Sequence, residues 1–84
     1  MRKEEVWSVP IRRVISFFET QADMTPDGEH RFTFGSCRIT LEEAAPADTG
    51  IIAVSRTRLI IEGDDADATA AYRRFFLHFL SAGG

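Results

Sequence analysis

A β-hairpin centred on Gly35-Ser36 constrains this chain more than any other feature of its sequence. Residues 31–34 and 37–42 both alternate polar and apolar side chains, and the two residues between them begin with glycine. Alternation of this kind is typical of half-buried strands, and a two-residue loop with glycine first predicts a type II′ turn. The sequence therefore predicts an antiparallel hairpin with a defined register.

This turn also determines which side chains share a face of the hairpin. The opposed pairs are Phe34 with Cys37, Thr33 with Arg38, Phe32 with Ile39, and Arg31 with Thr40. We expect one face to be buried, and it carries Phe32, Phe34, Cys37, Ile39 and Leu41. The opposite face, with Arg31 and Arg38, is expected to meet solvent.

Two helices are predicted on either side of the strands. After a short first strand over 6–9, Pro10 suits a helix start, and Ser8 is the best available cap. Apolar residues recur there at helical spacing: Ile11, Val14, Ile15, Phe18 and Ala22. Asp64 or Asp65 caps a second helix with Asp67 in its first turn, and Gly83 is placed to stop it. Its apolar stripe comprises Ala68, Ala71, Tyr72, Phe75, Phe76, Phe79 and Leu80.

The remaining segments are predicted to be turns, a loop and further strands. Residues 25–28, Thr-Pro-Asp-Gly, predict a β-turn, and residues 44–50 predict a surface loop. Residues 51–54 and 58–62 are rich in β-forming apolar residues. They form either two short strands around 55–57 or one long bulged strand, and the sequence leaves both alternatives open.

These elements together predict an α+β fold with the order β-α-β-β-(β-β)-α. The expected architecture is a two-layer domain, in which an antiparallel sheet of three to five strands carries two helices on one face. A chain of 84 residues can bury one hydrophobic core, so residues 1–84 are expected to form a single domain. The uncovered sheet face is where we expect function to lie.

The composition argues against several classes of partner and compartment. A net charge of −3 and a pI near 5.3 make nucleic acid an unlikely partner. The first residues lack the apolar run of a signal peptide, and no segment approaches the roughly 20 apolar residues of a membrane span. With one cysteine there is no intramolecular disulfide, so we expect a cytoplasmic protein without membrane attachment.

Arginine supplies the leading functional candidate. Arg31 and Arg38 project from the open sheet face, and Arg58 and Arg56 are added from the following strand segment. Guanidinium groups bind carboxylates and phosphates in a bidentate manner, so this face could engage an acidic protein or a small anionic ligand. In the competing interpretation, the arginines pair across strands with Glu29, Glu42 and Glu62 on a solvated face.

Catalytic chemistry finds little support in the sequence. Cys37 and His30 could form a nucleophile and base, but both are predicted on the core-facing side, where a cysteine acts as a small apolar residue. Two histidines 48 positions apart do not match a metal site. We therefore predict a protein that is not an enzyme and has no metal or cofactor.

Two further features have alternative interpretations. The terminal Gly83-Gly84 resembles the end of ubiquitin-like sulfur carriers, which are similar in length, and this implies a carrier acting through its terminal carboxylate. Here, however, the glycines follow a predicted helix. Trp7, Phe17 and Leu77 fall outside the apolar stripes drawn above, which indicates either a homodimer interface or stripes that are drawn imperfectly.

Overall fold

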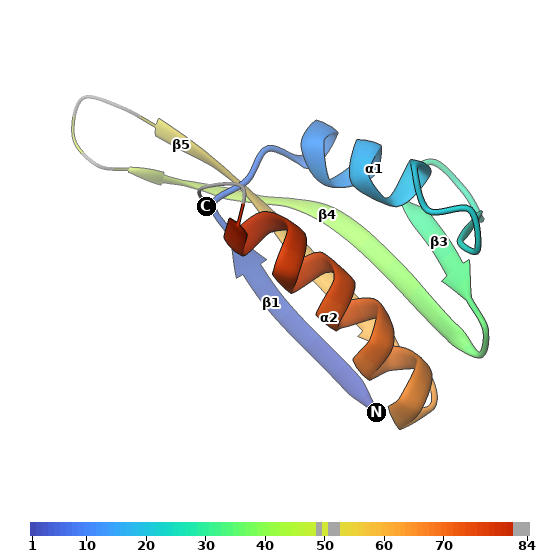
Figure 1. The fold of residues 1–84 in the computed structure, drawn as a ribbon. Helices are drawn as coiled ribbons and strands as arrows, with labels where there is room; N and C mark the ends of the chain where they lie inside the picture. The colour runs from blue at the N-terminus through green and yellow to red at the C-terminus, as the bar shows by residue number, and fades with distance from the viewer. Residues whose placement is uncertain (49, 51–52, 82–84) are drawn as a thin grey trace.

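The computed structural model describes residues 1–48, 50 and 53–81, which form five strands and two helices (Figure 1). Their order along the chain is β1 (Arg2–Trp7), α1 (Ile11–Glu19), β2 (Thr25–Pro26), β3 (Arg31–Phe34), β4 (Cys37–Asp48), β5 (Ala53–Glu62) and α2 (Asp65–Ser81). The strands form one antiparallel sheet with the spatial order β1-β5-β4-β3-β2. Both helices pack on the same face of this sheet, so the predicted two-layer α+β fold is confirmed.

The predicted hairpin has the predicted register. Phe34 pairs with Cys37, and Phe32 pairs with Ile39, as the position of the turn requires. The apolar residues of β3 and β4 face the helices; Phe32 is 2% exposed and Ile39 is fully buried. The turn glycine has φ 58, and no described residue other than glycine has a positive φ, which is the pattern of a type II′ turn.

The hairpin turn is also attached to the start of α2. The carboxylate of Asp67 accepts hydrogen bonds from the Ser36 backbone N–H at 2.8 Å and from the Ser36 hydroxyl at 2.9 Å. These two bonds hold the pKa of Asp67 below its usual value. The contact fixes the hairpin against the helical layer.

The N-terminal elements differ from the predicted boundaries. The first strand covers Arg2–Trp7 rather than 6–9, because six residue pairs with β5 stabilise a charged segment that has little strand propensity of its own. Pro10 is the N-cap of α1, without a side-chain capping bond, so the predicted cap at Ser8 is wrong. The helix ends at Glu19, short of Ala22, and Thr20 donates its hydroxyl to the Phe17 carbonyl at 2.6 Å.

The central segments contain more strand than predicted. Thr25–Pro26, assigned to a turn, pairs with β3 as the short strand β2, and the turn follows it, where the Asp27 N–H donates to the Arg31 carbonyl. The predicted loop over 44–50 is wrong up to Asp48, because β4 continues that far with a register shift between Ala44 and Ala47. Residues 51–62 are predicted to form either two short strands or one long strand. Their described part is one strand, β5, and residues 51–52 lie outside the described range.

Aromatic side chains fill the space between the layers. Phe18 of α1 is fully buried and contacts Phe32 of the sheet and Phe75 of α2, with ring centroids 5.6 and 6.1 Å away. Burying a side chain of this size contributes about 1.5–3 kcal/mol. The core therefore joins both helices and the hairpin in one cluster.

A buried hydroxyl fixes where α1 begins. Thr57, on the helix-facing side of β5, is 1% exposed and donates its hydroxyl to the Val9 carbonyl at 2.6 Å. A buried carbonyl without a hydrogen-bond partner would be costly, so this bond holds the connection between β1 and α1 against the sheet.

We predict that Gly35→Ala destabilises the protein by about 1–3 kcal/mol, the usual cost of holding a residue in a sparsely populated backbone conformation. A Cβ at this position would also lie 2.5 Å from Oδ2 of Asp67 and would disturb its bonds to Ser36. Urea denaturation measures the loss. Gly50→Ala is the matched control, because its φ is 96 but nothing lies within 4 Å of the added Cβ; an equal loss in both variants would contradict the contact with Asp67.

Candidate functional site

The open sheet face carries charged side chains in opposed rows. Arg38 lies between Thr33 of β3 and Glu62 of β5, while Arg58 lies between Glu42 and Val6. These side chains point away from the helical layer, because their neighbours in sequence, such as Leu59 and Ile39, face the core. The predicted placement of the arginines on this face is therefore confirmed.

Ion pairs neutralise one half of this face. Arg58 lies 3.5 Å from the Glu4 carboxylate and 3.7 Å from the Glu42 carboxylate. Arg2 lies 2.9 Å from Glu4 and 3.8 Å from Glu62. The competing interpretation of cross-strand pairing thus holds for Arg58 with Glu42, and Glu4 contributes a pairing that the sequence did not indicate.

The other half of the face has arginines without such partners. Arg31 and Arg38 are exposed, and neither forms an ion pair with a described residue. They occupy diagonal positions on β3 and β4, which places their Cα atoms about 7–8 Å apart. Thr40 and Thr33 stand opposite them and add two hydroxyl groups. We call these four residues the Arg31–Arg38 patch.

Arg56 lies apart from this patch. Its Nε donates to the Ala45 carbonyl at 2.9 Å, and its Cα pairs with Ala44. Arg56 lies six positions before Glu62 in β5, which corresponds to about 20 Å along a strand. Glu62 is the residue that pairs with Arg38. The structure therefore does not join Arg56 to the other predicted arginines.

A groove between the two helices is a second candidate that the sequence analysis missed. It has a volume of about 360 Å³ and lies between α1 and the last turns of α2. Its lining comprises Arg12, Arg13, Ser16, Phe17, Thr20, His78 and Phe79. The helical spacing of α1 places the groove residues of that helix on one face, and it can be read from the sequence. Only tertiary packing brings His78 and Phe79 beside them.

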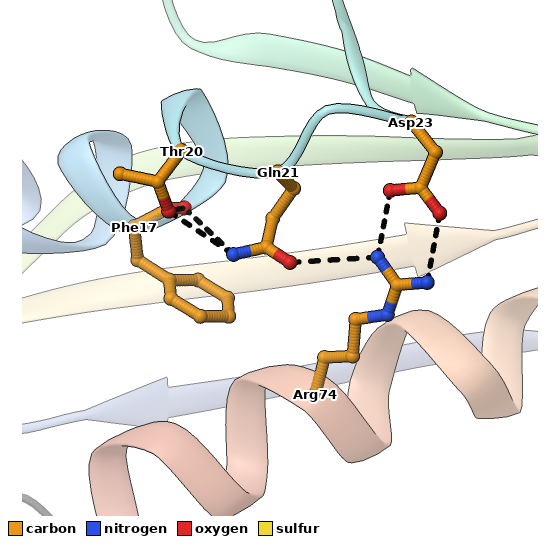
Figure 2. Close-up of polar contacts among 5 residues, drawn as sticks. All are labelled: Phe17, Thr20, Gln21, Asp23 and Arg74. Carbon is orange, nitrogen blue, oxygen red and sulfur yellow. Dashed lines mark hydrogen bonds and ion pairs between the residues drawn. The ribbon is translucent and has the colours of Figure 1, made fainter.

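Hydrogen bonds among Thr20, Gln21, Asp23 and Arg74 join the end of α1 to α2 at one end of this groove (Figure 2). We call these four residues the latch. Arg74 of α2 binds the Asp23 carboxylate in a bidentate manner at 2.7 and 2.8 Å, and it lies 3.4 Å from the Gln21 side-chain oxygen. The Gln21 amide donates in turn to the Thr20 hydroxyl at 3.1 Å. The hydrogen bond from Arg74 lowers the pKa of Asp23, so the pair remains charged at neutral pH. The latch fixes the end of α1 against α2.

Cys37 and His30, considered above as a nucleophile and base, are not brought together. Cys37 lies beside the hairpin turn and is 1% exposed, whereas His30 lies beyond the other end of β3 and is half-buried rather than core-facing. Burial, and then the charge of Asp67, raise the pKa of the Cys37 thiol. The thiolate is therefore disfavoured, as expected for an apolar core position.

The residues predicted for a homodimer have different environments. Phe17 is 8% exposed and packs in the core, and Trp7 packs edge-on against Phe75 at 4.9 Å. For these two residues the alternative of imperfectly drawn stripes therefore applies, because both pack between the layers. Leu77 is 54% exposed, and so is Leu80 at 56%, although the sequence placed Leu80 on the buried stripe.

Three further predictions concern metal binding, membrane attachment and the terminal glycines. No group of three or more potential metal ligands is found within 1–48, 50 and 53–81. None of the helices in the described part of the chain is long and apolar enough to cross a membrane. Gly83 and Gly84, on which the carrier interpretation rests, lie outside the described residues.

A charged cluster joins edge strand β1 to α2. Oε1 of Glu5 accepts hydrogen bonds from the Trp7 indole at 2.9 Å and from the Tyr72 hydroxyl at 2.7 Å. Burial, followed by this bond and the charge of Glu5, raises the pKa of Tyr72 to about 12. Lys3 lies over the Tyr72 ring, 4.4 Å from its centroid. These side chains satisfy one another, so we regard the cluster as structural.

Comparisons with known proteins do not assign this arrangement to a family. A scan against protein-family models gives no match, and a search of curated proteins finds no significantly similar sequence. The functional argument therefore rests on the two surfaces described above.

We predict that Tyr72, the one tyrosine in the sequence, titrates near 12 while the protein remains folded. Since the unfolded pKa is near 10, the stabilisation from the neutral phenol is complete below pH 10 and is lost as the pH rises toward 12. Near-ultraviolet absorbance measures the phenolate, and circular dichroism monitors the fold. Glu5→Gln should lower the Tyr72 pKa, while Glu4→Gln should not. A folded wild-type protein with a Tyr72 pKa near the ordinary value would contradict the contact.

Proposed function

We propose that this chain is a non-catalytic, cytoplasmic binding module whose Arg31–Arg38 patch engages an extended acidic segment of a protein partner. The observation that supports the proposal is the contrast on one sheet face. Arg58 and Arg2 already have carboxylate neighbours within 4 Å, whereas Arg31 and Arg38 have none among the described residues. The free, buried thiol of Cys37 is compatible with a reducing compartment.

The spacing of the patch favours a particular partner geometry. The two arginine Cα atoms are about 7–8 Å apart, as diagonal positions on paired strands are. In an extended peptide, residues i and i+2 point to the same side and are about 6.6–6.8 Å apart. An acidic segment with carboxylates at alternate positions therefore matches the two guanidinium groups, and its backbone or side-chain oxygens can accept from the hydroxyl of Thr40, since that of Thr33 donates to the Thr25 carbonyl.

The expected affinity is modest and sensitive to salt. Exposed ion pairs contribute at most about 1 kcal/mol each, so loss of two pairs weakens binding by up to roughly 30-fold. Because both arginines are exposed, mobile ions screen them, and the binding should weaken as the ionic strength rises above about 0.1 M. Such properties suit a reversible interaction.

We predict that Arg31→Gln combined with Arg38→Gln weakens binding of a labelled peptide of repeated Glu-Thr pairs by up to roughly 30-fold in low salt. Fluorescence anisotropy measures the affinity, and a peptide of repeated Lys-Thr pairs tests the sign of the charge. Arg13→Gln with Arg73→Gln is the matched control, because it removes the same charge from exposed helix residues that form no ion pair with a described residue.

The comparison of the two double variants decides the proposal. Selective loss in the Arg31 and Arg38 variant supports the patch. Equal weakening in both variants would show that only overall charge matters, and no binding of the acidic peptide by the wild-type protein would exclude the proposed partner class.

A further inference from the structure

The groove between α1 and α2 differs chemically from the other hollows beside α1. Two neighbouring hollows, of about 330 and 300 Å³, also include Arg12, but both are lined by Glu43 and one by Glu29 as well. Among the residues that the structure describes, no carboxylate lines the groove, although Arg12 and Arg13 stand on its rim. The described lining therefore carries a net positive charge.

The two rim arginines are available to a ligand. Both are exposed, and neither forms an ion pair with any residue in the described ranges. They lie on consecutive positions of α1, one turn before Ser16 and Phe17. Arg13, Ser16, Phe17 and Thr20 recur at the spacing that places them on one face of the helix. The two guanidinium groups and the Ser16 hydroxyl therefore lie on the same side of the groove, whereas the Thr20 hydroxyl already donates to the Phe17 carbonyl.

The floor of the groove is aromatic. Phe17 and His78 stack with ring centroids 4.5 Å apart and an interplanar angle of 29°, and Phe79 lies edge-on to both rings. Phe17 and Phe79 are 8% and 2% exposed, whereas His78 is exposed, so a flat ring can stack on this surface through the His78 ring. With a volume of 360 Å³, the groove falls within the range of small-molecule sites.

The groove is also held in its shape before any ligand arrives. Thr20, at one end, is bonded to the Phe17 carbonyl and accepts a hydrogen bond from Gln21, which is tied through Arg74 to Asp23 (Figure 2). A preformed site avoids the cost of ordering loops and side chains during binding. The latch thus joins the segment that follows α1 to α2 beside the groove.

We propose that this groove is a binding site for a small molecule with a flat aromatic body and a single carboxylate or similar anionic group. The aromatic body stacks on the exposed His78 ring, which itself packs against the buried Phe17 and Phe79, and the anion accepts hydrogen bonds from the guanidinium groups of Arg12 and Arg13. Charge complementarity favours an anionic ligand, since the described lining of the groove presents two guanidinium groups and no carboxylate. This inference does not rest on the Arg31–Arg38 patch, which lies on the opposite face of the sheet.

The test uses naphthoate as the probe and neutral naphthamide as its isosteric comparison. Titration of the full chain is followed through backbone amide resonances by NMR. We expect shifts confined to α1 and the last turns of α2, and binding of naphthamide that is at least about tenfold weaker, because it cannot form charge-assisted bonds.

Two kinds of variant locate the site. Arg12→Gln with Arg13→Gln should weaken naphthoate binding by at least about tenfold, whereas Arg2→Gln with Arg73→Gln, which removes the same charge, should leave it unchanged. Ser16→Phe fills the groove from an exposed helix position and should block both probes without unfolding the protein. Amide spectra without ligand verify the fold of every variant.

Several results would overturn the inference. Equal affinity for naphthoate and naphthamide would contradict recognition of the anionic group. Unchanged naphthoate binding in the Arg12 and Arg13 variant, or after Ser16→Phe, would show that the probe binds elsewhere. Amide resonance shifts on the sheet face instead of the helices would show the same. Concentration-dependent broadening of the groove resonances without ligand would show that a second copy of the chain occupies the groove, and this too would exclude the small-molecule assignment.

Discussion

The packing of Phe18 against both layers is the interaction on which the rest of the structure depends. This ring is fully buried and joins α1 to Phe32 of the hairpin and to Phe75 of α2. A small domain has only one core, so the two helices and the sheet are stabilised by the same set of contacts. With this cluster in place, α1 and α2 lie side by side, and the far side of the sheet is left uncovered.

Both proposed binding surfaces are consequences of this arrangement. The sheet face holds the Arg31–Arg38 patch because the hairpin turns its apolar side chains toward Phe18 and its partners. The groove exists because Phe17, next to Phe18, packs against His78 and Phe79 of the other helix. A protein with net negative charge can thus expose cationic sites on two sides, because some of its carboxylates already accept hydrogen bonds from within the protein. Asp67 accepts from Ser36, and Asp23 accepts from Arg74.

Polar contacts position these surfaces more than they stabilise the fold. The Asp67 contact with Ser36 fixes the hairpin turn against α2, and the Arg74 contact with Asp23 fixes the end of α1. Both contacts are largely exposed, so their contribution to stability is small compared with burial of the aromatic rings. Their effect is instead on the relative placement of the elements that carry the candidate sites.

The sequence by itself determined the hairpin, its register and its inward and outward faces, because the turn and the alternation of side chains are local properties of residues 31–42. It also determined the two-layer class and the presence of two helices. It did not determine the length of β1 or β4, because charged and alanine-rich segments become strands only through pairing with β5. Nor could it show that Glu4 and Glu42 neutralise Arg58, or that Arg12 and Arg13 stand beside His78. Those contacts join residues distant in the chain, and only tertiary packing brings them together.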